Sequence, residues 1–205
     1  METTPKQKTG ARSDTQYSVR TKNEQVAKQL FQNARLNLLN VNSWHTLTGS
    51  DIVFQLVNDK GEEIQGLVEK GNYFRIHIPG VPADSTGQGS EWVHVEKVEE
   101  GKMKYHEFVS VRVRPSAAPG YASDKPAHFF SSKATSTFSV VRNSSRLTVS
   151  ISGRNEKPNT DTHDFLSYIR NVIVALGAMI GLNKPEWKSL AKGIIKKKAA
   201  VLRTM

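Results

Sequence analysis

The amino-acid sequence predicts an α+β fold in which a curved antiparallel sheet or barrel of about seven strands packs against helices. Residues 51–152 consist almost entirely of short strand-like runs, whereas helical periodicity occurs before them at 21–40 and after them at 161–204. Hydrophobic residues make up 37% of the 205 positions and aromatic residues 8%, which suits a globular core. We therefore expect one α+β domain over residues 21–205.

The first forty residues predict a tail followed by a helix. Residues 1–20 are rich in Thr, Ser, Gln, Lys and Gly and have little apolar content, which indicates a disordered tail. Thr21 and Glu24 have the spacing of a capping box, in which each side chain accepts a backbone N–H of the other residue. Apolar residues then recur at helical spacing, at Val26, Ala27, Leu30, Phe31, Ala34 and Leu38.

Seven strands are predicted between residues 51 and 152, because apolar runs alternate there with turn signals. The predicted strands cover residues 52–57, 62–68, 73–78, 92–98, 105–113, 135–141 and 147–151. Short strands at such close intervals are typical of an antiparallel sheet or barrel.

Two long helices are predicted after the sheet. The first runs over residues 161–180, and its apolar stretch is interrupted by Arg170 and Asn171, which indicates a buried helix rather than a membrane span. The second begins near Pro185, and lysines occupy much of the surface that its apolar residues leave. Its apolar stripe consists of Trp187, Leu190, Ile194, Ile195, Val201 and Leu202.

This layout predicts a space between the sheet and the C-terminal helix. Spaces of this kind commonly hold small apolar ligands, although a fully packed core is an equally good interpretation. The order of elements resembles that of helix-grip proteins of the START or polyketide-cyclase type, which have a strongly bent antiparallel sheet around a long C-terminal helix. In that fold the first strand normally precedes the short helices, whereas here a helix is predicted to come first.

The net charge of +10 lies mainly at the two ends of the chain. Residues 1–22 carry a net charge of +3 and residues 184–205 a net charge of +6, whereas residues 23–183 carry only +1. A body that bound nucleic acid would usually have a basic face, so the strand-rich part argues against that role. The absence of cysteine excludes disulfides and thiolate sites and, with no apolar leader in the first ten residues, leads us to expect a cytoplasmic protein.

No catalytic signature is present, and whether the protein is an enzyme stays open. The sequence contains no G-x-S-x-G, P-loop, G-x-G-x-x-G or EF-hand motif. Its six histidines form neither an H-x-H nor an H-E-x-x-H pair, so we expect no metal site and no cofactor.

Basic residues on predicted strands are the sharper candidates for ligand binding. Arg75 shares one strand face with His77, and Arg112 shares another with Arg114. Because arginine makes bidentate contacts with carboxylates, these residues predict a cationic patch for an anion, with an ordinary solvent-exposed sheet face as the alternative.

Two further segments hold candidates. The polar residues 152–159, including Arg154, Asn155 and Glu156, predict either a site or a hydrogen-bonded connection to the helices. Trp44 and His45 follow the first helix, where Trp44 also suits a core position. The ligand-binding candidates are therefore Trp44, His45, Arg75, His77, Arg112, Arg114 and Arg154.

We consider three functions. The leading hypothesis is a domain that binds an apolar or amphipathic small molecule between the sheet and the C-terminal helix. One alternative is an interaction protein whose basic amphipathic helix at residues 184–205 binds a membrane surface or a protein partner. The other alternative is weak nucleic-acid binding through the basic ends of the chain.

Overall fold

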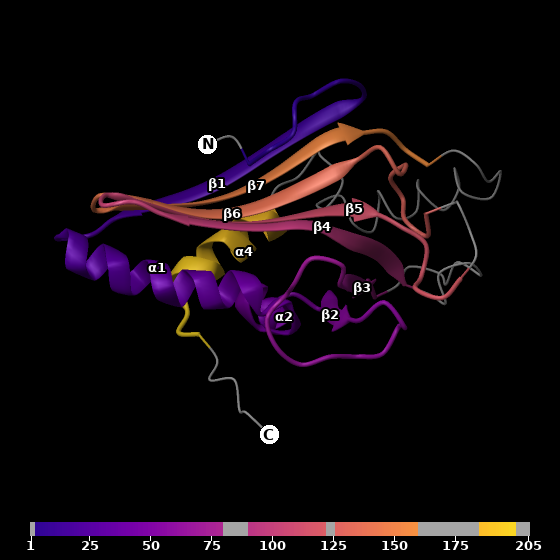
Figure 1. Cartoon of the computed structure of the whole chain (residues 1–205), viewed down its shortest axis with the longest axis horizontal. Helices are drawn as coiled ribbons and strands as arrows, with labels where there is room; N and C mark the ends of the chain where they lie inside the picture. Colours follow the sequence, from indigo (N-terminus) through magenta and orange to yellow (C-terminus); the bar gives the residue numbers. More distant parts are fainter. Residues whose placement is uncertain (1–2, 80–89, 122–125, 160–184, 200–205) are drawn as a thin grey trace.

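The predicted fold class is confirmed by the computed structural model, which describes residues 3–79, 90–121, 126–159 and 185–199 (Figure 1). The strands within these residues are β1 (Ala11–Arg20), β2 (Val53–Val57), β3 (Tyr73–His77), β4 (Glu91–Lys102), β5 (His106–Pro115), β6 (Thr135–Asn143) and β7 (Arg146–Glu156). They form one antiparallel sheet in the order β1-β7-β6-β5-β4-β3-β2. The helices are α1 (Glu24–Leu39), η1 (Val41–Ser43), α2 (Trp44–Thr48) and α4 (Pro185–Lys196).

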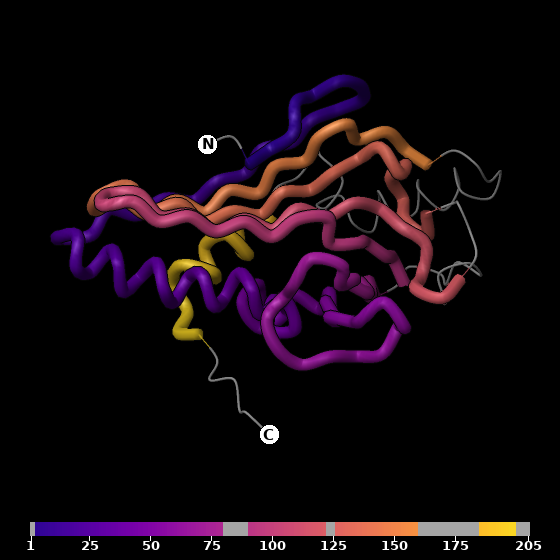
Figure 2. Tube along the Cα trace, viewed as in Figure 1, coloured from indigo at the N-terminus to yellow at the C-terminus, as the bar shows by residue number. Residues whose placement is uncertain are grey.

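The sheet curves over α1 and α4, which lie on its concave side (Figures 1 and 2). Each central strand places alternate apolar side chains on that side, as Val109, Val111 and Val113 do on β5. On α4 the residues Leu190 and Ile194 are fully buried in the same core. The apolar stripe on which the free-helix alternative depends is therefore covered by the body of the protein over this part of the chain.

A glycine brings α4 close to α2. A Cβ atom on Gly193 would overlap the backbone carbonyl of Leu47 in α2. Glycine is the residue that permits such a close approach of two backbones, so the sequence specifies how deeply α4 sits against α2.

The tail prediction was wrong for residues 11–20, which form the edge strand β1. Their cross-strand partner is β7, the last strand along the chain, and Tyr17 lies opposite Val149. The concave face of β1 carries Thr15, Tyr17 and Val19, a set too polar to produce a strong apolar alternation. The strand depends on pairing with a segment more than a hundred residues away, which no local pattern reports.

The strand predicted at residues 62–68 was also wrong, although the total of seven strands holds. Opposite β2 this segment makes only an isolated bridge between Val57 and Glu63, in which Ile64 N–H donates to the Leu56 carbonyl and Asn58 N–H to the Glu62 carbonyl. Its last residue, Val68, instead donates its N–H to the Leu39 carbonyl at the end of α1. The side chain of Asn42 takes the place of strand pairing, because it accepts the Leu56 N–H at 2.6 Å and donates to the Ile64 carbonyl at 2.9 Å.

The first helix begins two residues later than the capping-box spacing predicted. Asn23 is the N-cap, and its side-chain oxygen accepts the Val26 N–H at 3.0 Å. Thr21 instead donates its hydroxyl to the carbonyl of Ser145, which lies in the turn just before β7. With β1 placed before α1, the chain starts with a strand, and the departure from helix-grip element order that the sequence predicted disappears.

The helix predicted over residues 161–180 lies outside the described residues. Among the helices that are described, none is long and apolar enough to cross a membrane.

Candidate functional site

Trp44 lies at the centre of the core and does not reach the surface. Its side chain is fully buried, and its indole N–H donates to the carbonyl of Asn37 at 3.1 Å and of Leu38 at 3.2 Å. Three phenylalanine rings, those of Phe54, Phe74 and Phe138, pack against the indole with centroids 4.8–5.8 Å away. The neighbouring His45 is exposed, and its imidazole contacts only the Thr46 hydroxyl among the hydrogen bonds of the described residues.

The basic strand residues are partnered by acids on the opposite side of the sheet from the core. Arg112 and Arg114 both bind the Glu96 carboxylate, Arg112 through Nε at 3.0 Å. Arg75 pairs with Glu63, and His77 is exposed. A carboxylate already occupies these guanidinium groups, so an anionic ligand would have to displace it.

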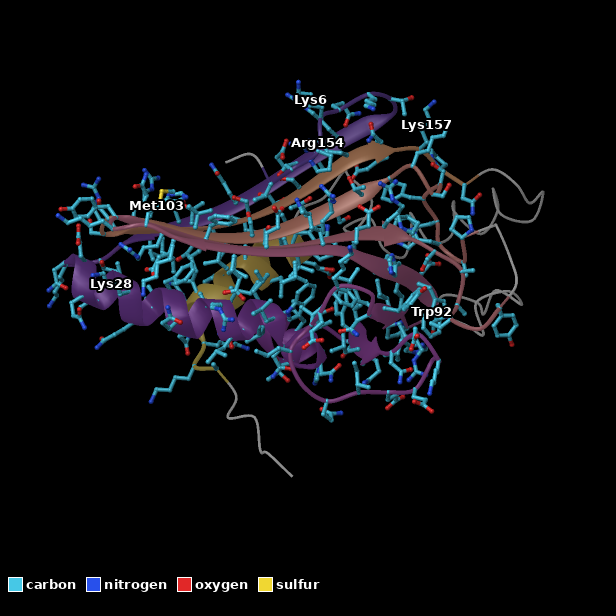
Figure 3. All side chains as sticks on the ribbon, viewed as in Figure 1. Lys6, Lys28, Trp92, Met103, Arg154 and Lys157 are labelled. Atoms are coloured by element: carbon cyan, nitrogen blue, oxygen red, sulfur yellow. The ribbon has the colours of Figure 1, made fainter. Side chains whose placement is uncertain are left out.

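Arg154 fastens the edge strand β1 to β7. Its guanidinium donates to Asp14 at 2.8 Å and to the Ser13 carbonyl at 3.1 Å, both on β1 (Figure 3). It also donates to the carbonyl of Gly153 at 2.7 Å. The seven predicted ligand-binding residues therefore do not form one site, and none of them lines the cavity described next.

A cavity of about 60 Å³ lies between the concave face of the sheet and α4. Its walls are mostly apolar and come from the sheet strands, the segment 128–130 and Trp187 of α4. The apolar lining residues are Phe54, Phe74, Ile76, Ile78, Val93, Val113, Phe129, Phe130, Phe138, Ile151 and Trp187. The polar ones are Ser13, His128, Ser136 and Glu156, with Gly153 beside them.

Glu156 is a buried acid on this wall. Ser13 donates its hydroxyl to Glu156 Oε1 at 2.7 Å. A Cβ atom on Gly153 would overlap the same oxygen, so the carboxyl group occupies space that only a glycine leaves free. Burial raises the pKa of Glu156, and the Ser13 hydrogen bond and the Arg154 charge only partly oppose that effect.

His128 is a buried neutral imidazole on the same wall. Its Nδ1 accepts the Phe130 N–H at 2.9 Å, which places the ring proton on Nε2. Burial lowers the pKa of His128 to about 3. The nearby Glu91 carboxylate, 3.9 Å from Nδ1, accepts the Phe129 N–H at 2.8 Å and so fixes the backbone that carries these rings.

Of the four polar residues that line the cavity, the sequence singled out only Glu156, and it missed Ser13, His128 and Ser136. Glu156 belongs to the polar segment 152–159 that was singled out. Ser13 was missed because it lies in the residues assigned to the tail, and its role depends on strand pairing. His128 lies in an irregular segment without a motif, and the aromatic run from His128 to Phe130 is the one signal that marked it. No cluster of three or more metal-ligating side chains occurs within the described residues.

Comparisons with known proteins add only distant likenesses of structure. No protein-family model matches the sequence, and no curated protein matches it either. A hypothetical protein from Helicobacter pylori is 9% identical, with 95% of this chain and 97% of that chain covered and a TM-score of 0.46. A truncated norcoclaurine synthase from Thalictrum flavum is 10% identical, with 94% and 96% covered and a TM-score of 0.42.

A major latex-like protein from Panax ginseng is also 10% identical, with 83% of this chain and 99% of that chain covered and a TM-score of 0.34. Similarities at this level carry no argument about function. The cavity and the residues that line it are therefore the basis for a function.

Proposed function

We propose that this protein binds an apolar small molecule that carries one polar group, in the cavity between the sheet and α4. The observation that carries the proposal is an apolar cavity between the sheet and α4 whose wall also holds buried polar side chains. Ligand sites in proteins have this composition, a mostly apolar lining with a few fixed polar groups that orient the ligand.

The aromatic walls suit a flat apolar group. Phe54, Phe74 and Phe138 present ring surfaces to the cavity, and the indole of Trp44 supports all three rings from behind. Because all three rings pack on the indole, their positions are set before a ligand arrives, and binding costs little side-chain ordering. A volume of about 60 Å³ has room for a small group rather than for a large ligand.

The polar wall suits a single hydrogen-bonding group of the ligand. Ser13 and Glu156 belong to β1 and β7, and Arg154 holds the two strands together beside them. A ligand group that hydrogen-bonds with the Glu156 carboxyl would recover part of the free energy that burial of this acid costs.

The experiment is native mass spectrometry of the freshly purified protein, followed by thermal unfolding with added benzene, indole and naphthalene. We expect extra mass that disappears on denaturation, or a rise in the unfolding midpoint with at least one of these probes. The largest of the three probes that raises the unfolding midpoint shows how large a molecule the cavity accepts. A bare mass together with no shift for any probe would rule out the proposal.

A matched pair of variants locates the binding. Ile76→Phe enlarges a half-buried cavity residue on β3 and should abolish the response to the probes while the protein stays folded. The double variant Arg112→Gln, Arg114→Gln changes the opposite face of the sheet and should leave the response unchanged. A loss in the arginine variant alone would instead favour the cationic site that the sequence predicted.

A further inference from the structure

Three chain segments meet at one end of the sheet, and we call residues 20–28, 102–106 and 143–146 the hairpin tip. The amide of Ser144 donates to the Tyr105 carbonyl at 2.7 Å, which joins the β6–β7 turn to the β4–β5 turn. The amide of Thr21 donates to the Ser145 carbonyl at 2.9 Å, which joins the start of α1 to the same place. The three segments therefore form one continuous surface at the left of Figure 1.

Two apolar side chains project from this surface into solvent. Met103 is 62% exposed and Tyr105 is 49% exposed, and they flank Lys104 in the β4–β5 turn (Figure 3). Lys104 Nζ lies 5.0 Å from the centre of the Tyr105 ring. Two neighbouring apolar side chains rimmed by charged groups have the composition of a surface that contacts a membrane or another molecule.

Basic residues surround the two apolar side chains. The hairpin tip contains six basic residues and one acidic residue, Glu24. Arg20 lies directly opposite Arg146 across β1 and β7, and two like charges in that position destabilise a sheet. Neither arginine forms an ion pair with an acidic side chain in the part of the chain that the structure describes.

We propose that the hairpin tip docks on an anionic membrane surface, with Met103 and Tyr105 inserted among the lipid headgroups and the basic residues around them bound to lipid phosphates and carboxylates. Met and Tyr suit the interface between headgroups and acyl chains, and basic residues near an anionic leaflet add attraction. This surface lies at the opposite end of the sheet from Ser13, Gly153 and Glu156, so the proposal is independent of the proposed cavity function.

The test is cosedimentation of the full chain with vesicles of phosphatidylcholine alone and with vesicles of equal parts phosphatidylcholine and phosphatidylserine. We expect binding to the mixed vesicles only. Lys104→Glu, Arg146→Glu should weaken that binding by at least about 30-fold, because each basic residue at the surface contributes about five-fold. Met103→Ser, Tyr105→Ser should weaken it by roughly ten-fold through the loss of inserted apolar area, without changing the thermal unfolding midpoint.

The matched control is Lys6→Glu, Lys157→Glu, which makes the same change in net charge at the other end of the molecule (Figure 3). Both lysines are exposed, and this control should retain the binding of the wild-type chain. An equal loss in the control would overturn the proposal, because the attraction would then follow total charge. A tip that binds a labelled oligonucleotide but neither kind of vesicle would overturn it as well, in favour of nucleic acid.

Discussion

The two ends of the sheet bury their ionisable groups in opposite ways. At the hairpin-tip end, Arg142 donates to Glu107 at 2.5 Å, so a buried base lies beside a buried acid. At the cavity end, the nearest hydrogen-bond donor to Glu156 is a hydroxyl group, and His128 is kept neutral by burial. The first end compensates its charges within the core, whereas the second leaves polar groups beside an unfilled space.

This difference separates the structural role of the Glu107–Arg142 pair from the binding role proposed for the cavity. A buried ion pair that lacks one member leaves an uncompensated charge, so the loss of Arg142 or Glu107 alone should destabilise the fold. A buried acid whose burial is only partly compensated costs stability, and such acids cluster at binding and catalytic sites. The comparison therefore supports the proposed ligand binding at the cavity end, and three measurements can break or sharpen that proposal.

The largest loss of stability is expected when the buried Glu107–Arg142 ion pair is broken. Arg142→Met leaves Glu107 buried without its partner and should lower the free energy of unfolding by about 3–5 kcal/mol. The double variant with Glu107→Leu should recover most of this loss, because it removes both charges. Urea unfolding of the three proteins measures these values, and a double variant as unstable as the single one would contradict the pairing argument.

The next largest effect is the loss of stability that the protonation of His128 should cause at acidic pH. Its pKa is about 3 in the folded protein and 6.5 in the unfolded chain, so the unfolded chain binds the proton more tightly. Between pH 6.5 and pH 3 the free energy of unfolding should therefore fall by about 1.4 kcal/mol for each pH unit. His128→Gln keeps an acceptor for the Phe130 amide and should remove most of this slope in urea unfolding measured across that range.

The smallest effect is the opposite response of Glu156. Burial raises its folded pKa above the ordinary value of 4.5, so the folded protein holds this proton more tightly than the unfolded chain does. Stability from this group is complete below pH 4.5 and is lost as the pH rises through the raised pKa. Glu156→Gln should flatten that decline, and an unchanged pH profile in the variant would show that Glu156 is solvated like a surface acid.

The sequence determined the class of fold through periodicity. The alternation in β5 and the helical spacing of Leu190 and Ile194 are local properties, because side-chain direction follows the period of the backbone. The sequence also shows directly that most of the net positive charge lies at the two ends of the chain. These features needed no knowledge of which segments meet.

Only the tertiary structure decided the first strand and the polar wall of the cavity. β1 forms because β7 supplies its hydrogen bonds, and the Ser13–Glu156 contact joins residues 143 positions apart. Likewise, the arginines on β5 looked available in sequence, whereas Glu96 reaches them through an irregularity in the β4–β5 pairing. Contacts between distant segments depend on strand order and register, and a local pattern contains neither.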